Sequence, residues 1–310
     1  MAETPVAAEG RRKGLSDGGA YLILTVAMAA WSGNIVVARA VVDVVPPFVF
    51  SLGRWSIAFM AVLPFVAGEL YAKRAIILRQ WPLFLFLGVL SVTLANGLTY
   101  VGATMSTAIN GAMVTSAGPM ATVAVAYLVF RERTTWGQIQ GIVLSSIGVL
   151  TILTHGSVEN LAQLSFNWGD LFYFLGIIAW ALYSLLLRRV SLELSPLVVV
   201  TLMFGVGILT FLPLHLIFEQ KSFSEIPLTL PIVAAFFYVG LFPSVLSFIS
   251  WNAAVKVIGT NRAIPFNHLN PLITTFLAFL FLHEEIAAYH LLGAALIFAG
   301  IFLAGRKSRA

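Results

Sequence analysis

The sequence predicts an all-α integral membrane protein in which ten transmembrane helices form two inverted five-helix repeats. Hydrophobic residues make up 59% of the 310 residues and charged residues only 10%, whereas soluble domains carry about 25% charged residues. The apolar stretches are continuous and do not alternate with polar residues, which favours helices over a membrane barrel. In addition, one long segment of the chain occurs twice.

A shift of 152 residues relates the segment 105–152 to the segment 257–304. The positions that are identical in the two copies are Pro119/Pro271, Thr122/Thr274, Ala126/Ala278, Leu128/Leu280, Glu132/Glu284, Gly141/Gly293, Leu144/Leu296 and Gly148/Gly300. Proline and glycine are costly inside a helix, and they are among the residues that both copies retain. This selective identity indicates an internal duplication. A shift of 149 extends it toward the start of the chain, pairing Trp31 with Trp180, Arg39 with Arg188 and Pro47 with Pro196.

We expect ten spans, because each apolar stretch approaches the roughly 20 residues that cross about 30 Å of hydrocarbon. Their approximate limits are residues 20–42, 48–68, 82–102, 107–130, 136–154, 169–188, 196–218, 231–254, 260–282 and 287–305. The repeats are then residues 18–154 and 169–305, with an extracytoplasmic connection at 155–168. Since five is an odd number, the two repeats enter the membrane in opposite directions, as in many secondary transporters.

Most of the 18 Lys and Arg residues gather on one side of the predicted membrane. They lie in the tails 1–17 and 306–310 and in the connections at 73–79, 131–133, 188–189 and 256–262. The positive-inside rule therefore places both basic tails in the cytoplasm, the first of them disordered. We expect a multi-pass protein of the cell inner membrane that contacts the lipid bilayer and no nucleic acid.

Two prolines interrupt spans that are otherwise apolar. Pro119 and Pro271 each remove a helical hydrogen bond, to the carbonyl groups of Thr115 and Asn267. One interpretation is that nearby Thr and Asn side chains satisfy the broken turns; the other is that both kinks face a central cavity. His268, beside the second kink, is a core residue, a substrate contact or a proton relay.

Polar and aromatic side chains recur inside several spans, and such side chains usually face the interior of a bundle. Asn96 and Tyr100 share a helical face on the third span, and Ser244, Phe248 and Trp251 form a matching stripe on the eighth. The candidate substrate-binding residues are Trp31, Asn34, Asn96, Tyr100, Thr115, Trp180, Tyr183, Ser244, Phe248, Trp251, Asn267 and His268, with Pro119 and Pro271 as kink or gating residues.

Several other features point to structure. We expect Arg54 to reach outward or to cap carbonyl groups, and Glu132 and Glu284 to close turns. Gly137, Gly141 and Ser145 are spaced for close helix approach, consistent with a monomer or a weak homodimer.

Known catalytic and nucleotide-binding motifs are absent from the sequence. There is no Walker A loop, no H-E-x-x-H and no G-x-S-x-G, so we expect no enzyme activity, no catalytic residue and no cofactor. Cysteine is absent as well, and we expect no metal site. Efflux of hydrophobic cations would require a carboxylate embedded in the cavity, which the sequence does not reveal. A receptor or structural protein without transport is the alternative of another class.

The pattern Trp31-Ser32-Gly33-Asn34, Arg54 in the second span and the repeated Pro, Glu, Gly and Gly resemble the EamA-type drug/metabolite transporter superfamily over residues 20–305. Within it, the chain resembles bacterial aromatic amino acid exporters. The resemblance implies a cavity between helices 1, 3, 4, 6, 8 and 9, and export of aromatic amino acids and related small amphipathic metabolites by alternating access. Broad efflux of hydrophobic or cationic drugs is the alternative within transport. Trp180 is followed by Ala181-Leu182-Tyr183 instead of Ser-Gly-Asn, so the two sides of the cavity differ.

Overall fold

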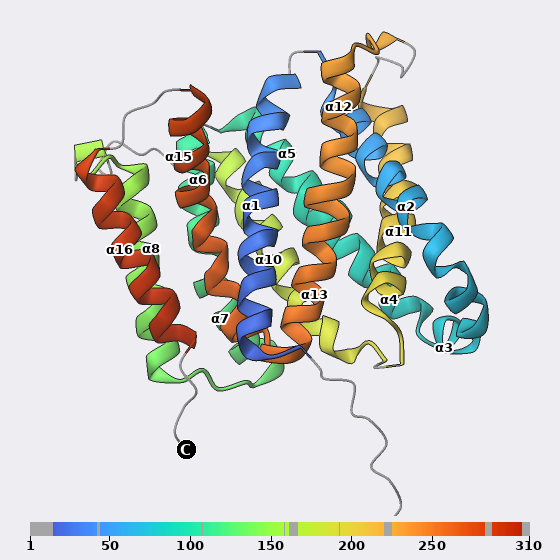
Figure 1. Cartoon of the computed structure of the whole chain (residues 1–310), viewed down its shortest axis with the longest axis horizontal. Coiled ribbons are helices and arrows are strands. Elements are labelled where there is room, and N and C mark those ends of the chain that lie inside the picture. The colour runs from blue at the N-terminus through green and yellow to red at the C-terminus, as the bar shows by residue number, and fades with distance from the viewer. Residues whose placement is uncertain are drawn as a thin grey trace, which may run out of the picture.

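The computed structural model describes residues 15–41, 44–106, 108–157, 159–160, 167–191, 193–219, 225–282 and 287–305, which form helices and connections without a strand. The first half of the chain, shown from blue to green in Figure 1, contains α1 (Asp17–Val41), α2 (Pro47–Ala72), α3 (Arg74–Arg79), α4 (Trp81–Gly88), α5 (Ala95–Met105), α6 (Ala108–Ser116), α7 (Gly118–Phe130) and α8 (Trp136–Leu153). The second half contains α10 (Trp168–Leu186), α11 (Pro196–Phe218), α12 (Leu230–Val239), α13 (Ser247–Ile258), α14 (Thr260–Ala263), α15 (Leu269–Leu282) and α16 (Ala288–Gly305).

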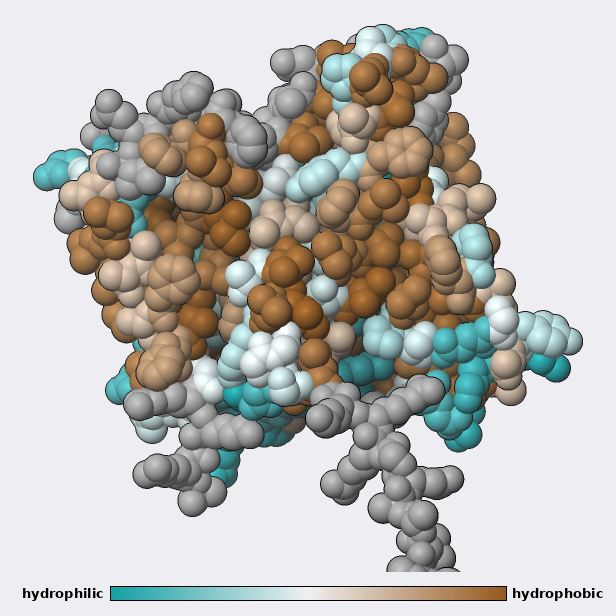
Figure 2. Space-filling view, in the orientation of Figure 1, coloured by the Kyte–Doolittle hydropathy of each residue, from teal (hydrophilic) through white to brown (hydrophobic). Residues whose placement is uncertain are grey.

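Seven continuous helical stretches of the described residues are long and apolar enough to cross a bilayer: Pro47–Ala72, Trp81–Thr99, Trp136–Leu153, Trp168–Arg189, Pro196–Phe218, Leu230–Ile258 and Ala288–Gly305. The other expected spans fall on α1 and on two interrupted segments, α6 with α7 and α14 with α15, so the count of ten remains a prediction. Exposed apolar side chains such as Phe65 and Leu209 fit contact with lipid. Figure 2 shows hydrophobic side chains over the middle of the visible surface and hydrophilic ones toward its lower edge. The protein is therefore a multi-pass membrane protein.

The start of α1 and the end of α16 lie together on one face, which we call the terminal face. Arg262 of α14 joins them, because its guanidinium contacts the Asp17 carboxylate at 3.2 Å and its Nε donates to the Gly305 carbonyl at 3.1 Å. The Tyr21 hydroxyl donates to the same carbonyl at 3.3 Å. The starts of α2 and α10 lie on the opposite face.

Helices α8 and α16 pack side by side and antiparallel, at the left in Figure 1. A Cβ atom on Gly141 would lie 2.5 Å from the carbonyl oxygen of Gly300, and one on Gly148 would lie 2.7 Å from that of Gly293. The two backbones touch at both points, and only glycine permits this approach. The small residues near Gly141 thus join two helices of the same chain.

Helices α2 and α11 also pack together, and each caps the start of the other. Glu69, near the end of α2, accepts hydrogen bonds from the Ser195 amide at 2.8 Å and the Ser195 hydroxyl at 2.6 Å. Glu219, just after α11, accepts from the amides of Phe48 at 2.6 Å and Val49 at 2.8 Å. Carboxylates satisfy the free amides of a helix start and complement its dipole. This reciprocal capping holds the pair antiparallel at both faces.

Two helical stretches contain π-helical turns at corresponding places: Val89–Leu94 between α4 and α5, and Gly240–Leu246 between α12 and α13. Two others break at the expected prolines. Helix α6 ends at Ser116 before Pro119, and a 3-10 turn at Ile264–His268 precedes Pro271 in α15. These irregular turns free backbone carbonyl groups within the bundle, where other protein groups satisfy them.

Candidate substrate site inside the bundle

Five of the candidate substrate-binding residues meet in one group of rings, which we call the aromatic cluster: Trp31, Trp180, Tyr183, Phe248 and Trp251. The Trp31 ring lies 5.5 Å from Trp180, 6.1 Å from Phe248 and 5.9 Å from Trp251, measured between centroids. Trp180 lies 5.1 Å from Tyr183. These distances are those of edge-to-face and tilted aromatic pairs. Helices α1, α10 and α13 thus contribute a shared aromatic wall.

The π-turn between α12 and α13 connects Arg54 to this cluster. Pro243 has no amide hydrogen to donate to the Val239 carbonyl, and the Ser244 hydroxyl donates to that carbonyl instead, at 2.8 Å. The Pro243 carbonyl accepts from Trp31 Nε1 at 2.8 Å, and Ser244 Oγ accepts from Arg54 Nε at 2.6 Å. Arg54 is buried and lies over the Trp55 ring. It therefore caps the irregular turn, one of the two roles expected for it.

The two kinks contact each other through His268. Its Nε2–H donates to the Ser116 carbonyl at 3.0 Å, and its Nδ1 is hydrogen bonded to the Ser145 hydroxyl at 2.7 Å. Ser116 and His268 are separated by 152 residues and are thus equivalent positions of the repeat. With both ring nitrogens engaged and the side chain buried, His268 links α6, α8 and the 3-10 turn. This geometry favours the core-residue interpretation.

Several polar atoms near the cluster lack a partner among the described residues, including Trp251 Nε1, Asn252 Nδ2 and Asn34 Oδ1. Trp55 Nε1, on a ring 5.5 Å from that of Phe248, is another. Asn252 follows Trp251 on α13, and its Oδ1 accepts a hydrogen bond from the Tyr183 hydroxyl. Asn34 lies one turn beyond Trp31 on α1. Buried polar atoms are nearly always hydrogen bonded, so each such atom requires an explanation. Trp251 Nε1 and Asn252 Nδ2 are thus buried donors, and Asn34 Oδ1 a buried acceptor, without a partner among the described residues.

The structure does not bring the remaining predicted residues into the aromatic cluster within the part of the chain that it describes. Asn96 donates to the Ser91 carbonyl at 2.8 Å and so satisfies the first π-turn. Thr115 is exposed, and Asn267 is half-buried on the 3-10 turn. The side chain of Tyr100 lies outside the described residues, as does Glu284. Glu132 pairs with Arg188 instead of closing its own turn.

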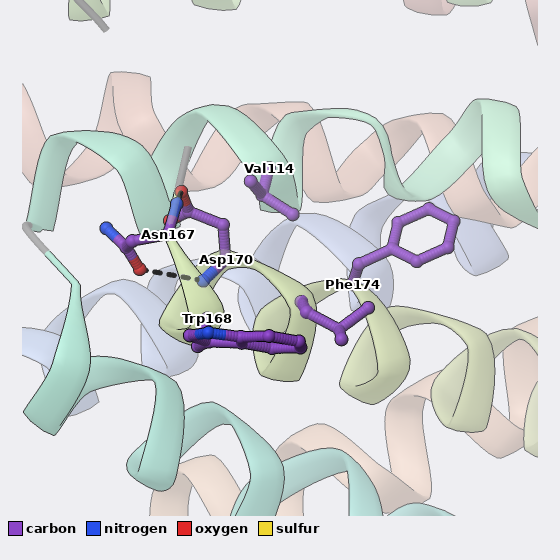
Figure 3. Close-up of a pocket in the computed structure, with 6 residues that line it drawn as sticks. Val114, Asn167, Trp168, Asp170 and Phe174 are labelled. Carbon is purple, nitrogen blue, oxygen red and sulfur yellow. Dashed lines mark hydrogen bonds between the residues drawn. The ribbon is translucent and has the colours of Figure 1, made fainter. Parts of the chain in front are cut away.

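A cavity of about 560 Å³ opens where α10 begins, on the opposite face (Figure 3). It is lined by Val114 of α6 and by Asn167, Trp168, Asp170, Leu171 and Phe174. Asp170 is 3% exposed, a buried carboxylate that we did not identify from the sequence. The signal was available, because Asn167-x-x-Asp170 ahead of an apolar run is a capping-box pattern, and both of its hydrogen bonds are present.

Comparison with known proteins supports the functional class. The chain is 30% identical over 221 residues to YyaM, an uncharacterized transporter of Bacillus subtilis, with 71% of this chain and 72% of that protein covered. It is 26% identical to a probable terminal-alkyne amino-acid exporter of Streptantibioticus cattleyicolor, with 93% of each chain covered. A solved structure with 18% identity matches the fold with a TM-score of 0.74, over 93% of this chain and 97% of the other.

The model of the EamA-like transporter family matches residues 18–154 and again residues 167–306. Each match includes one copy of the repeated segment, residues 105–152 in the first match and 257–304 in the second. Relatives of the chain are named transporters and not enzymes. This protein therefore belongs to the EamA-like transporter family.

Proposed function

We propose that this protein exports aromatic amino acids and related small amphipathic metabolites from the cytoplasm, by alternating access through the aromatic cluster. The observation that carries the proposal is the set of unsatisfied polar atoms beside the rings. A carboxylate would accept from Trp251 Nε1 and Asn252 Nδ2, and an ammonium would donate to Asn34 Oδ1. The rings of the cluster supply the wall for an aromatic side chain. An aromatic amino acid carries all three complementary groups.

The amino-acid exporter of Streptantibioticus cattleyicolor supports the substrate class, since it aligns with almost the whole chain. Alternating access is supported by contacts between equivalent residues. Trp31 meets Trp180, which lies 149 positions later, and Ser116 meets His268. A pseudo-two-fold axis in the membrane plane, as in ten helices arranged as two inverted repeats, produces such contacts. The basic terminal face then lies in the cytoplasm.

Counterflow of labelled Trp or Phe into liposomes that contain only this protein tests the proposal. We expect labelled substrate to accumulate in liposomes preloaded with the unlabelled amino acid. Excess unlabelled aromatic amino acid added outside should abolish this accumulation, and Trp251→Ala should weaken it. A second candidate, efflux of hydrophobic cations, is favoured by the buried Asp170 beside a cavity. Flux of such a cation without flux of any aromatic amino acid would replace the first proposal with the second. Absence of flux for every solute would point to a protein that does not transport.

Topology is tested separately, because the chain has no cysteine of its own. A single Arg74→Cys variant places a thiol in the basic connection after α2. An impermeant maleimide added to intact cells should leave it unlabelled, whereas labelling after permeabilisation should be complete. Labelling in intact cells would reverse the proposed orientation.

A further inference from the structure

The cavity beside Asp170 has the size of a ligand site but takes no part in the aromatic cluster. Its volume of about 560 Å³ falls within the range of about 300–1,000 Å³ typical of small-molecule pockets. In Figure 3, Trp168, Phe174 and Val114 surround the same space as Asn167 and Asp170. Trp168, Leu171 and Phe174 are exposed to it and to the surroundings of the helix. Apolar walls thus lie next to a polar end.

The polar end of the cavity contains the Asp170 carboxylate. No cationic side chain among the described residues pairs with it. Asp170 Oδ1 accepts from the Ser106 hydroxyl at 2.5 Å, and Oδ2 accepts from Asn110 Nδ2 at 3.2 Å and the Asn167 amide at 2.9 Å. All three donors are neutral. The helices that pack together here, α5 to α7 and the start of α10, carry no cation either, because residues 95–130 and 167–187 contain no Lys, Arg or His. Buried charges in proteins are normally paired.

Among the described residues, the carboxylate retains capacity for one more donor. An ionised carboxylate accepts at about four lone-pair positions, and described residues occupy three of them, two on Oδ2 and one on Oδ1. Within the part of the chain that the structure describes, the position left over belongs to Oδ1. Aromatic faces next to a carboxylate form the environment that an organic ammonium prefers, since the rings attract a cation as well.

We propose that this cavity binds an amphiphile with an ammonium group, its nitrogen at Asp170 Oδ1 and its aromatic or alkyl body along Trp168, Leu171 and Phe174. The site does not depend on aromatic amino acid export, because it shares no residue with the aromatic cluster. The ammonium belongs either to a soluble amine or to the headgroup of an amine lipid, and the test separates these sources.

The test measures phenethylamine binding to the full-length protein in phosphatidylcholine nanodiscs by titration calorimetry. Phenethylamine should bind, whereas 3-phenylpropionate, which carries a carboxylate in place of the ammonium, should not. Asp170→Asn keeps the size of the side chain and removes the charge. It should weaken binding by about 10- to 100-fold, the worth of a charge-assisted hydrogen bond. Glu193→Gln, at an exposed carboxylate, should leave binding unchanged.

A second variant keeps the inference testable if Asp170→Asn does not fold. Val114→Trp fills the cavity from α6 and leaves Asp170 and its three donors in place. It should abolish phenethylamine binding, while the matched Leu209→Trp on a lipid-exposed surface should not. Trp251→Ala should also leave phenethylamine binding intact, which separates this site from the proposed transport site.

Three results would overturn the assignment: no phenethylamine binding by the wild type, equal binding by Asp170→Asn when folded, or full binding by Val114→Trp. Nanodiscs that contain phosphatidylethanolamine identify the source. Weaker phenethylamine binding by the wild type in these nanodiscs than in phosphatidylcholine nanodiscs assigns the site to a headgroup. Undiminished phenethylamine binding assigns it to a soluble amine.

Discussion

The two ends of the helix bundle contain equivalent residues in different surroundings. At the terminal face, residues 183–187 of α10 and its 3-10 extension are buried without interruption, and so are residues 263–266. A helix that is buried at consecutive positions is covered on every side. The equivalents of Tyr183 and Leu186 under the shift of 149 are Asn34 and Val37, and both are only half-buried. Thr115, the equivalent of Asn267, is exposed.

Hydrogen bonds reinforce this difference. At the terminal face the Thr260 hydroxyl donates to the Ser184 carbonyl at 3.0 Å, in addition to the contacts of Arg262. The cavity beside Asp170 lies at the opposite face. The repeated pattern therefore fixes which helices meet but leaves their packing free to differ. The structure is closed at the terminal face and more open on the other side.

The largest effect on stability is expected at the close contact between α8 and α16, which runs from one end of the bundle to the other. Gly141→Leu places a side chain against the Gly300 backbone, which cannot yield. Overpacking typically costs about 1–3 kcal/mol, and here rigid backbone opposes it on one side. Size-exclusion chromatography should show loss of folded protein. Gly68→Leu, where a Cβ meets nothing within 4 Å, should elute as the wild type, and equal behaviour of the two variants would refute the tight seam.

Thiol accessibility measures the difference between the ends directly. Ala254 is 0% exposed in the terminal half, whereas Thr115 is exposed. In purified protein, Thr115→Cys should react with a soluble maleimide at least ~100-fold faster than Ala254→Cys, because the buried thiol requires an opening that costs several kcal/mol. Similar rates at the two positions would show that the terminal face is open in solution.

A smaller effect, on substrate affinity, is expected from loss of one ring of the aromatic cluster. Trp251→Ala should weaken the apparent affinity for labelled Trp by about 5- to 100-fold, because both burial and ring contacts are lost. Trp136→Ala removes an exposed indole at the start of α8 and should change little. Counterflow at a series of substrate concentrations provides both values. An unchanged affinity in Trp251→Ala would move the substrate site away from the aromatic cluster.

The smallest effect concerns the contact that closes the terminal face. Arg262→Ala removes a partly exposed ion pair with Asp17 and the bond to Gly305. Such pairs contribute about 0.2–1 kcal/mol, so the labelling rate of Ala254→Cys should rise by up to ~5-fold. Lys73→Ala, which breaks an exposed pair with Glu193, is the control. No difference between the two variants would show that Arg262 does not hold this face closed.

Much of this architecture was predictable from residues that restrict the backbone. Pro119 and Pro271 locate the two interruptions because proline has no amide hydrogen to donate to the carbonyl four residues earlier. Gly141 was recognised as a packing residue, but its partner was not, because only the folded chain brings α16 against α8. Asp170 was overlooked for a related reason. Its capping pattern is local, whereas its other hydrogen bonds come from Ser106, just after α5, and from Asn110 of α6. The sequence leaves the role of His268 open, because Ser145 and Ser116, which contact its two ring nitrogens, lie far from it in the chain.

The seam between α8 and α16 has the form of an isologous interface. Gly141 meets Gly300 while Gly148 meets Gly293, and the shift of 152 exchanges one pair for the other. In such an interface residue i meets j and residue j meets i. Each half of the chain therefore carries both kinds of contact glycine, one from each pair. Two copies of a single half, inserted in opposite directions, would present the same complementary glycines to each other.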